Sequence, residues 1–264
     1  MTVEKKVLVP LDFSAKTFHV LQFVLRNAGT FNWSVFVLLS FDNERLDENE
    51  NIDQAFERLL TQFRSEFPLV KISGEAIRGD LLQMLLEVNT NEHFDLIVSA
   101  QYTDVLQYTT RNLMEGLVEQ CYTPVLVLPE NSDLPDLQRI GVMTSFHEDE
   151  IESIKLVEQL FNGKLFVTIF HILEENENER SLERMREWEL VVKGNIENSK
   201  VGFLVVESES VIEGVRRVIM GERIDLLVVT SISKTFIQKL LSRDLFKELT
   251  QTRVMQPTLF IRCV

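Results

Sequence analysis

The chain has 264 residues, of which 45% are hydrophobic and 26% charged, so its composition is that of a globular protein and argues against overall disorder. Its formal net charge of -14 argues against nucleic acid and anionic membrane surfaces as partners, because the long-range field repels phosphate groups. No apolar run approaches the roughly 20 residues that cross a bilayer, so no membrane span is expected.

The first residues run directly into a strand-like segment, which leaves no room for the apolar region of a signal peptide. Cys121 and Cys263 fit neither a disulfide framework nor a metal-ligand spacing. We therefore expect a cytoplasmic protein whose cysteines are thiols.

Strand-like and helical patterns alternate along the first half. We expect strands at 6–11, 34–41, 70–77, 94–99 and 124–129, and helices at 14–28, 50–67, 79–91 and 105–121. The strands are continuous apolar runs, as in a parallel sheet that is covered on both faces. Right-handed crossovers between such strands predict a doubly wound α/β layer.

The second half repeats the first. Three pairs of segments lie in the same order about 130 residues apart, which indicates an internal duplication: Phe94–Val98 with Ile224–Val228, 110–117 with 242–249, and Thr123–Leu128 with Gln256–Ile261. Helices are expected at 147–162, 180–197, 209–221 and 237–253. A polar segment with two prolines, 129–136, predicts a boundary near Asp133 and domains of 1–132 and 137–264.

Several polar clusters suggest other chemistry at first sight. The acidic loops at 47–51 and 174–179 lack the ligand spacing of a calcium loop, so we expect solvated loops and no metal site. The cluster His147–Glu150 is interpreted as a solvated helix start. The four histidines have no ligand spacing, and no phosphate-binding loop, dinucleotide fingerprint or nucleophile elbow occurs, so we expect no catalytic residues.

Ligands of an open parallel sheet bind beyond the carboxyl ends of its strands. In the first half this rule selects the loop Pro10–Ser14 and the segment that follows the fourth strand, up to Arg111 and Asn112. Asp12 has two interpretations: it accepts hydrogen bonds from a ligand, or it braces the first helix. Arg111 either binds an anion or covers the sheet end, and Asn112 also suits a capping box.

The chain resembles the universal stress proteins. The resemblance rests on Lys6–Ser14, Asp95–Val98 and Pro124–Val127, and it covers the chain as two copies. It implies two tandem doubly wound, open, parallel five-stranded sheets that form an internal pseudodimer. Domains of this family often pair through the last strand, which implies a seam between Val125–Leu128 and Leu259–Ile261.

Nucleotide-binding members of the family carry Gly-x-x-Gly after strand four, then about nine residues and Gly-Ser or Gly-Thr, because glycine lets the backbone approach phosphate. The pattern falls on Ala100 and Thr103 and on Arg111-Asn112, so no glycine is retained. In the second half it falls on Thr230, Ser233 and Arg243-Asp244, and Ser145 replaces Asp12.

Two functions follow from these residues. The first is a non-enzymatic stress-response or regulatory protein that acts through protein contacts, without ATP bound in the family's usual way and without another cofactor; a further homodimer is compatible with it. The alternative is a sensor that binds adenine nucleotide or another small molecule in the first half only. Its candidate site residues are Pro10, Asp12, Ala100, Thr103, Arg111 and Asn112.

Overall fold

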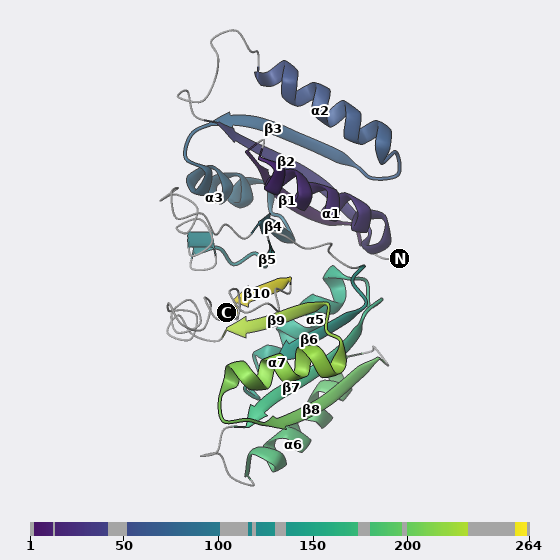
Figure 1. Cartoon of the computed structure of the whole chain (residues 1–264), viewed down its shortest axis with the longest axis vertical. Helices are drawn as coiled ribbons and strands as arrows, with labels where there is room; N and C mark the ends of the chain where they lie inside the picture. The colour runs from purple at the N-terminus through teal and green to yellow at the C-terminus, as the bar shows by residue number, and fades with distance from the viewer. Residues whose placement is uncertain are drawn as a thin grey trace. The chain divides into compact units, whose positions relative to one another are not determined.

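The computed structural model describes residues 3–12, 14–41, 52–100, 116–117, 120–129, 136–173, 180–196, 200–231 and 257–262 (Figure 1). The chain divides into two compact units, residues 1–130 and 131–264, called unit 1 and unit 2 below. Within the described ranges, no helix is both long and apolar enough to cross a membrane.

Unit 1 is a parallel five-stranded sheet with the order β3-β2-β1-β4-β5. Its strands are β1 (Lys5–Leu11), β2 (Trp33–Phe41), β3 (Ile72–Arg78), β4 (Leu96–Ala100) and β5 (Val125–Leu128). Its helices are α1 (Ala15–Phe31), α2 (Ile52–Glu66) and α3 (Leu81–Glu92). These bounds confirm the predicted elements to within about three residues. The predicted helix at 105–121 lies largely outside the described residues.

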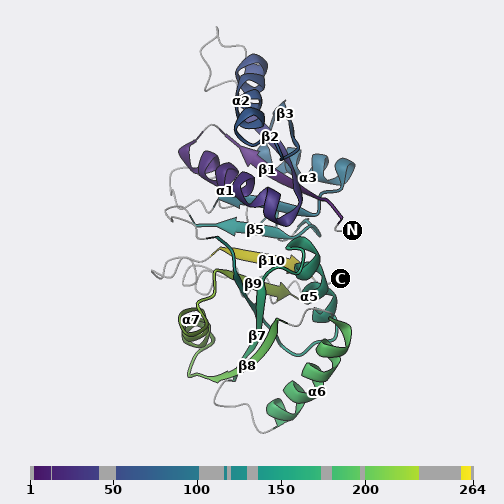
Figure 2. The ribbon, with the colours of Figure 1, turned by 90° about the vertical axis from the view of Figure 1, so that its right-hand side faces the viewer.

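Unit 2 has the same topology, with the parallel order β10-β9-β6-β7-β8. Its strands are β6 (Arg139–Met143), β7 (Phe166–Leu173), β8 (Val201–Glu207), β9 (Leu226–Ser231) and β10 (Thr258–Arg262). Its helices are α5 (Glu150–Leu160), α6 (Arg180–Asn195) and α7 (Val211–Glu222). In Figure 2, α5 and α6 lie on one face of this sheet and α7 on the other, which confirms the doubly wound layer.

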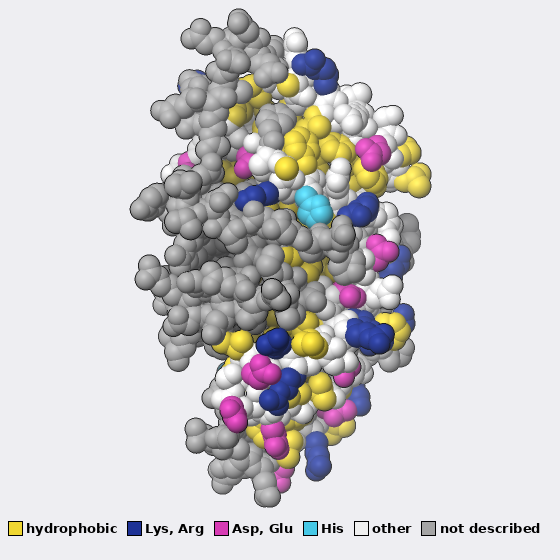
Figure 3. All heavy atoms as spheres, in the orientation of Figure 1, with side chains coloured by type: hydrophobic (Ala, Val, Ile, Leu, Met, Phe, Trp, Pro, Cys, Tyr) yellow, Lys and Arg dark blue, Asp and Glu magenta, His cyan; other side chains and the backbone are white. Residues whose placement is uncertain are grey.

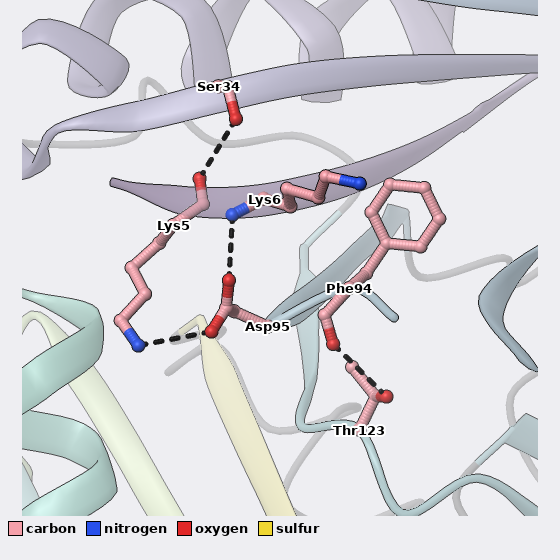
Figure 4. A network of polar contacts seen from close by, with 6 residues as sticks. All are labelled: Lys5, Lys6, Ser34, Phe94, Asp95 and Thr123. Carbon is pink, nitrogen blue, oxygen red and sulfur yellow. Dashed lines mark hydrogen bonds and ion pairs between the residues drawn. The ribbon is translucent and has the colours of Figure 1, made fainter. Parts of the chain in front are cut away.

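The duplication is visible in equivalent hydrogen bonds at the amino ends of the strands. In unit 1, Asp95 accepts the backbone N–H of Lys6 at 2.8 Å and its own N–H donates to the Lys6 carbonyl at 2.9 Å (Figure 4). In unit 2, Asp225 accepts the N–H of Arg139 at 2.9 Å and donates its own N–H to the Arg139 carbonyl at 2.9 Å. The two aspartates therefore fix the same pair of strands in each unit.

Unit 1 adds an ion pair to this arrangement. The Lys5 ammonium lies 3.0 Å from Asp95 Oδ1, and the lysine side chain is only 13% exposed (Figure 4). Beside it, the Thr123 hydroxyl donates to the carbonyl of Phe94 and to the side-chain oxygen of Asn89. These polar groups lie at the amino ends of the strands, and their contacts with one another give them a structural role.

Local capping residues mark the helix ends, and α1 continues three residues beyond its predicted end at residue 28. Ser14 caps α1 by accepting the N–H of Thr17 at 3.3 Å, and Asn32 ends the helix in the left-handed conformation with a φ of 58°. The caps of α3 and α7 are likewise equivalent: Asp80 accepts from Gln83, and Ser210 accepts from Glu213. Local capping thus places the helix starts at the carboxyl edge of each sheet.

Candidate functional site

The structure places three of the predicted site residues at one edge of the unit 1 sheet. Pro10 lies near the end of β1, Asp12 follows that strand, and Ala100 ends β4. When the register of the Leu8–Ile97 pair is extended by three residues, Ala100 lies opposite Leu11, the residue before Asp12. Thr103, Arg111 and Asn112 lie outside the described residues.

Asp12 braces the first helix. Its Oδ1 accepts the N–H of Ser14 at 2.9 Å and the hydroxyl of Thr17 at 2.8 Å, while Thr17 is buried at 1% exposure. The structure thus shows the bracing interpretation of Asp12 directly. Both of these hydrogen bonds use Oδ1.

Pro10 changes how the two central strands of unit 1 pair. It has no N–H to donate, and the β1–β4 ladder contains only the pairs Val7–Leu96 and Leu8–Ile97. The equivalent ladder in unit 2 continues to Met143 and Val229, where Met143 occupies the position of Pro10. The hydrogen-bonded pairing of the two central strands therefore ends earlier in unit 1, at the edge where open sheets bind ligands.

Unit 2 carries a buried carboxylate at the corresponding edge. Glu150, the first residue of α5, is 1% exposed, and its carboxylate accepts the N–H of Ser145 at 2.9 and 3.2 Å and the N–H of His147 at 3.3 Å. The Thr144 hydroxyl donates to Oε2, and the Thr230 hydroxyl lies 3.4 Å from Oε1. The prediction that His147–Glu150 is a solvated cluster is therefore wrong for Glu150, although the three residues before it are exposed.

A sequence signal for this burial exists. Glu150 lies on the helical stripe that continues through Ile154, Val157 and Phe161, all of them buried. Thr17 starts the same stripe in unit 1, which is continued by Leu21, Val24 and Ala28. The charges next to Glu150 in the sequence obscured this periodicity.

The stripes show that Thr17 and Glu150 occupy equivalent positions on their helices. In each unit an acid and a hydroxyl form a hydrogen bond between the loop and the helix, but the two residue types have exchanged places. Unit 1 has the acid in the loop, Asp12, and the hydroxyl on the helix. Unit 2 has hydroxyls in the loop, at Thr144 and Ser145, and the acid on the helix. Each unit therefore satisfies one carboxylate with its own donors at its sheet edge.

Phe146 lies beside this carboxylate in an unusual backbone conformation. Its φ is 63°, and its ring lies 4.2 Å from the His171 ring and 6.0 Å from the Trp188 ring, centroid to centroid. His171 contacts the Thr144 carbonyl through Nδ1 at 2.8 Å, and Trp188 donates its indole N–H to the His147 carbonyl at 3.3 Å. The aromatic side chains thus hold the loop that supplies the donors to Glu150.

The remaining candidates are described only in part. Within the described residues no group of three or more histidine, cysteine or acidic side chains has the arrangement of a metal site. Both acidic loops, Cys263, Ser233 and Arg243-Asp244 lie outside those residues, and Cys121 is buried. On the face drawn in Figure 3, lysine and arginine side chains are interspersed with acidic ones in each unit and form no continuous basic patch among the residues that are coloured.

Comparisons with known proteins agree with this architecture. No family model matches the sequence, and a search of curated proteins finds no match. Among solved structures, a universal stress protein from Archaeoglobus fulgidus DSM 4304 superimposes with a TM-score of 0.71 at 15% identity, covering 98% of this chain and 96% of that one. The fold is that of the universal stress proteins.

Two further structures extend the comparison of this universal stress protein fold. A putative universal stress protein from Pseudomonas aeruginosa UCBPP-PA14 matches with a TM-score of 0.66 at 14% identity, over 99% of this chain and 94% of that one. The cytoplasmic domain of a prokaryotic cation chloride cotransporter matches with a TM-score of 0.61 at 11% identity, over 98% and 95%. The fold is thus found in proteins of different kinds, so the function must be argued from the site.

Proposed function

We propose that this chain is a non-enzymatic stress-response or regulatory protein of the universal stress type, which acts through protein contacts and not through nucleotide turnover. The proposal rests on one observation: the carboxylates at the strand ends of both units already accept hydrogen bonds from groups of the protein. Asp12 is engaged by Ser14 and Thr17, and Glu150 is buried among donors of its own unit. These hydrogen bonds within each unit support a structural role for both carboxylates.

The absence of the phosphate glycines supports the same proposal. Ala100 is 3% exposed at the end of β4, and Thr230 at the equivalent position of unit 2 lies against Glu150. A side chain at this position fills the space that glycine leaves for a phosphate. Neither position offers the bare backbone on which phosphate binding in this family depends.

One observation favours the alternative, a sensor that binds adenine nucleotide or another small molecule in unit 1 only. The hydrogen-bonded pairing of β1 and β4 ends before Pro10 in unit 1, whereas the equivalent pairing in unit 2 continues to Met143 and Val229. Asp12 Oδ2 would then accept a hydrogen bond from a ribose or base. This alternative confines any ligand to the first unit.

Calorimetric titration of the purified chain with ATP, ADP, AMP and cyclic dinucleotides separates the two functions. Under the main proposal no nucleotide releases binding heat at micromolar concentration. Binding of ATP with a micromolar dissociation constant would contradict it and support the sensor.

If a nucleotide binds, variants of Asp12 and Thr17 show whether the Asp12 carboxylate holds it. Asp12→Ala removes the carboxylate, whereas Thr17→Val removes one of its hydrogen bonds and keeps the carboxylate in place. Asp12→Ala loses two hydrogen bonds, from the Ser14 N–H and from the Thr17 hydroxyl, and Thr17→Val loses the second together with the other contacts of that hydroxyl, at about 1 kcal/mol for each bond. A ligand held by Asp12 is therefore lost in Asp12→Ala and retained in Thr17→Val, and Ser145→Ala at the equivalent position of unit 2 serves as the control.

A further inference from the structure

The donors around Glu150 come from two parts of the chain that are distant in sequence. The loop after β6 supplies the N–H groups of Ser145 and His147 and the hydroxyl of Thr144. Thr230 comes from β9, 80 residues beyond Glu150, and its hydroxyl lies 3.4 Å from both Glu150 Oε1 and the Met143 carbonyl, between which its one proton is shared. These groups sit at the carboxyl edge of the two central strands, where the unit 2 sheet would receive a ligand.

The donor set has the chemistry of an anion site. Backbone N–H groups and hydroxyls that converge on two oxygens suit a carboxylate or one face of a phosphate. Both threonines are almost fully buried, Thr144 at 3% and Thr230 at 5% exposure, so water does not replace the contact at low cost. The four donors, from Thr144, Ser145, His147 and Thr230, are called the anion cradle below.

We infer that the ligand site of unit 2 is filled from within: Glu150 occupies the anion cradle as a built-in ligand. Phe146, in the same loop, packs its ring against His171 and Trp188 and so holds the donors around the carboxylate. The segment 144–150 thus supplies both the anion and three of the four groups that bind it. Unit 2 is held in one state without any small molecule, whether or not unit 1 binds one.

When Glu150 is replaced by alanine, the anion cradle loses its carboxylate and should accept an anion from solution. In Glu150→Ala, we expect the melting temperature to fall by about 5–10 °C, since buried donors lose a charged partner. Sodium acetate, formate or phosphate at ~100 mM should then raise it by about 3–5 °C, given half-saturation near ~10 mM, with sodium chloride of equal ionic strength as the reference.

Three further variants make the rescue specific. Asp149→Ala removes an exposed acid at the start of α5, so it should lower the melting temperature by less than Glu150→Ala does and should not respond to acetate. Glu150→Gln keeps the shape of the side chain and should be destabilised without rescue, because the cradle stays filled. Thr144→Val added to Glu150→Ala should abolish the rescue.

The outcomes are decisive in both directions. If Glu150→Ala folds only in the presence of acetate, formate or phosphate, and not in chloride, the inference is supported by the refolding yield itself. It is overturned if Glu150→Ala is as stable as Asp149→Ala, or if these anions stabilise it no more than the unmodified chain. It is also overturned if Glu150→Ala fails to fold in every anion, because the cradle would then not accept an external one.

Discussion

At the residue scale, the backbone of Phe146 bears a strain that follows from its left-handed conformation. A φ of 63° brings Cβ close to the backbone, which costs roughly 1–2 kcal/mol for a residue other than glycine. The contacts of its ring with His171 and Trp188 offset this cost, since aromatic pairs contribute about 0.5–1.5 kcal/mol beyond burial. The loop that positions the anion cradle therefore depends on this side chain.

This balance predicts an unusual order of stability. Phe146→Ala loses the ring contacts and keeps the strain, whereas Phe146→Gly loses the contacts and relieves the strain. We expect the glycine variant to be more stable than the alanine variant by about 1 kcal/mol, and both to be less stable than the unmodified chain, in urea unfolding experiments. Phe166, which lies in β7 outside the left-handed region, is the matched control, where the alanine variant should be the more stable of the two.

The sequence was informative about single residues where the chemistry is local, and less so where it is tertiary. Ser14 is a residue type that favours helix starts and it begins α1, whereas the predicted end at residue 28 falls short of the observed cap at Asn32. Asp12 had two interpretations, and only the geometry shows which partners it binds. The burial of Glu150 was missed because the charges next to it predicted exposure, although its place on the stripe with Ile154 and Val157 indicates burial.

At the element scale, the strands and helices were predictable because both faces of a parallel sheet are covered. A continuous apolar run such as Leu96–Val98 has few alternatives to a buried strand, and the helices between the strands have regular stripes. The exchange of acid and hydroxyl between α1 and α5 was not predictable from either element alone. It required the two stripes to be compared with each other and with the loops that contact them.

The close approach of β3 to β2 gives a prediction at this scale. A Cβ on Gly74 would lie 2.4 Å from the carbonyl oxygen of Val37 and 3.0 Å from the ring of Phe56. Because the nearer atom belongs to the backbone of β2, we expect Gly74→Ala to destabilise the protein by about 1–3 kcal/mol in chemical unfolding.

The equivalent outer strand of unit 2 supplies the control for this prediction. Gly202 in β8 is exposed, and a Cβ added to it would meet no neighbouring atom within 4 Å. Gly202→Ala should therefore be neutral or stabilising by up to about 1 kcal/mol. Equal effects of the two substitutions would show that the approach of β3 to β2 is not tight in solution.

At the scale of the whole molecule, each unit has an outermost strand that needs a partner. β5 has only β4 as a neighbour within unit 1, and its sequence Val-Leu-Val-Leu carries no charge or proline that would discourage association. β10 is likewise the outermost strand of unit 2, beside β9. The predicted seam between these strands would cover both edges within one chain, whereas a second copy of the chain would cover them by forming a homodimer.

Small-angle scattering over a concentration series distinguishes these two arrangements. A compact single chain of this length should have a radius of gyration of about 18 Å, and a compact pair of chains about 24 Å. We predict the smaller value, independent of concentration, together with slow amide hydrogen exchange in both Val125–Leu128 and Leu259–Ile261, because paired edge strands protect their N–H groups. If the mass instead doubles as the concentration rises, and hydrogen exchange in these strands slows in parallel, a second copy of the chain covers the edge strands. Rapid exchange in both strands at every concentration would show that the edges are not paired at all.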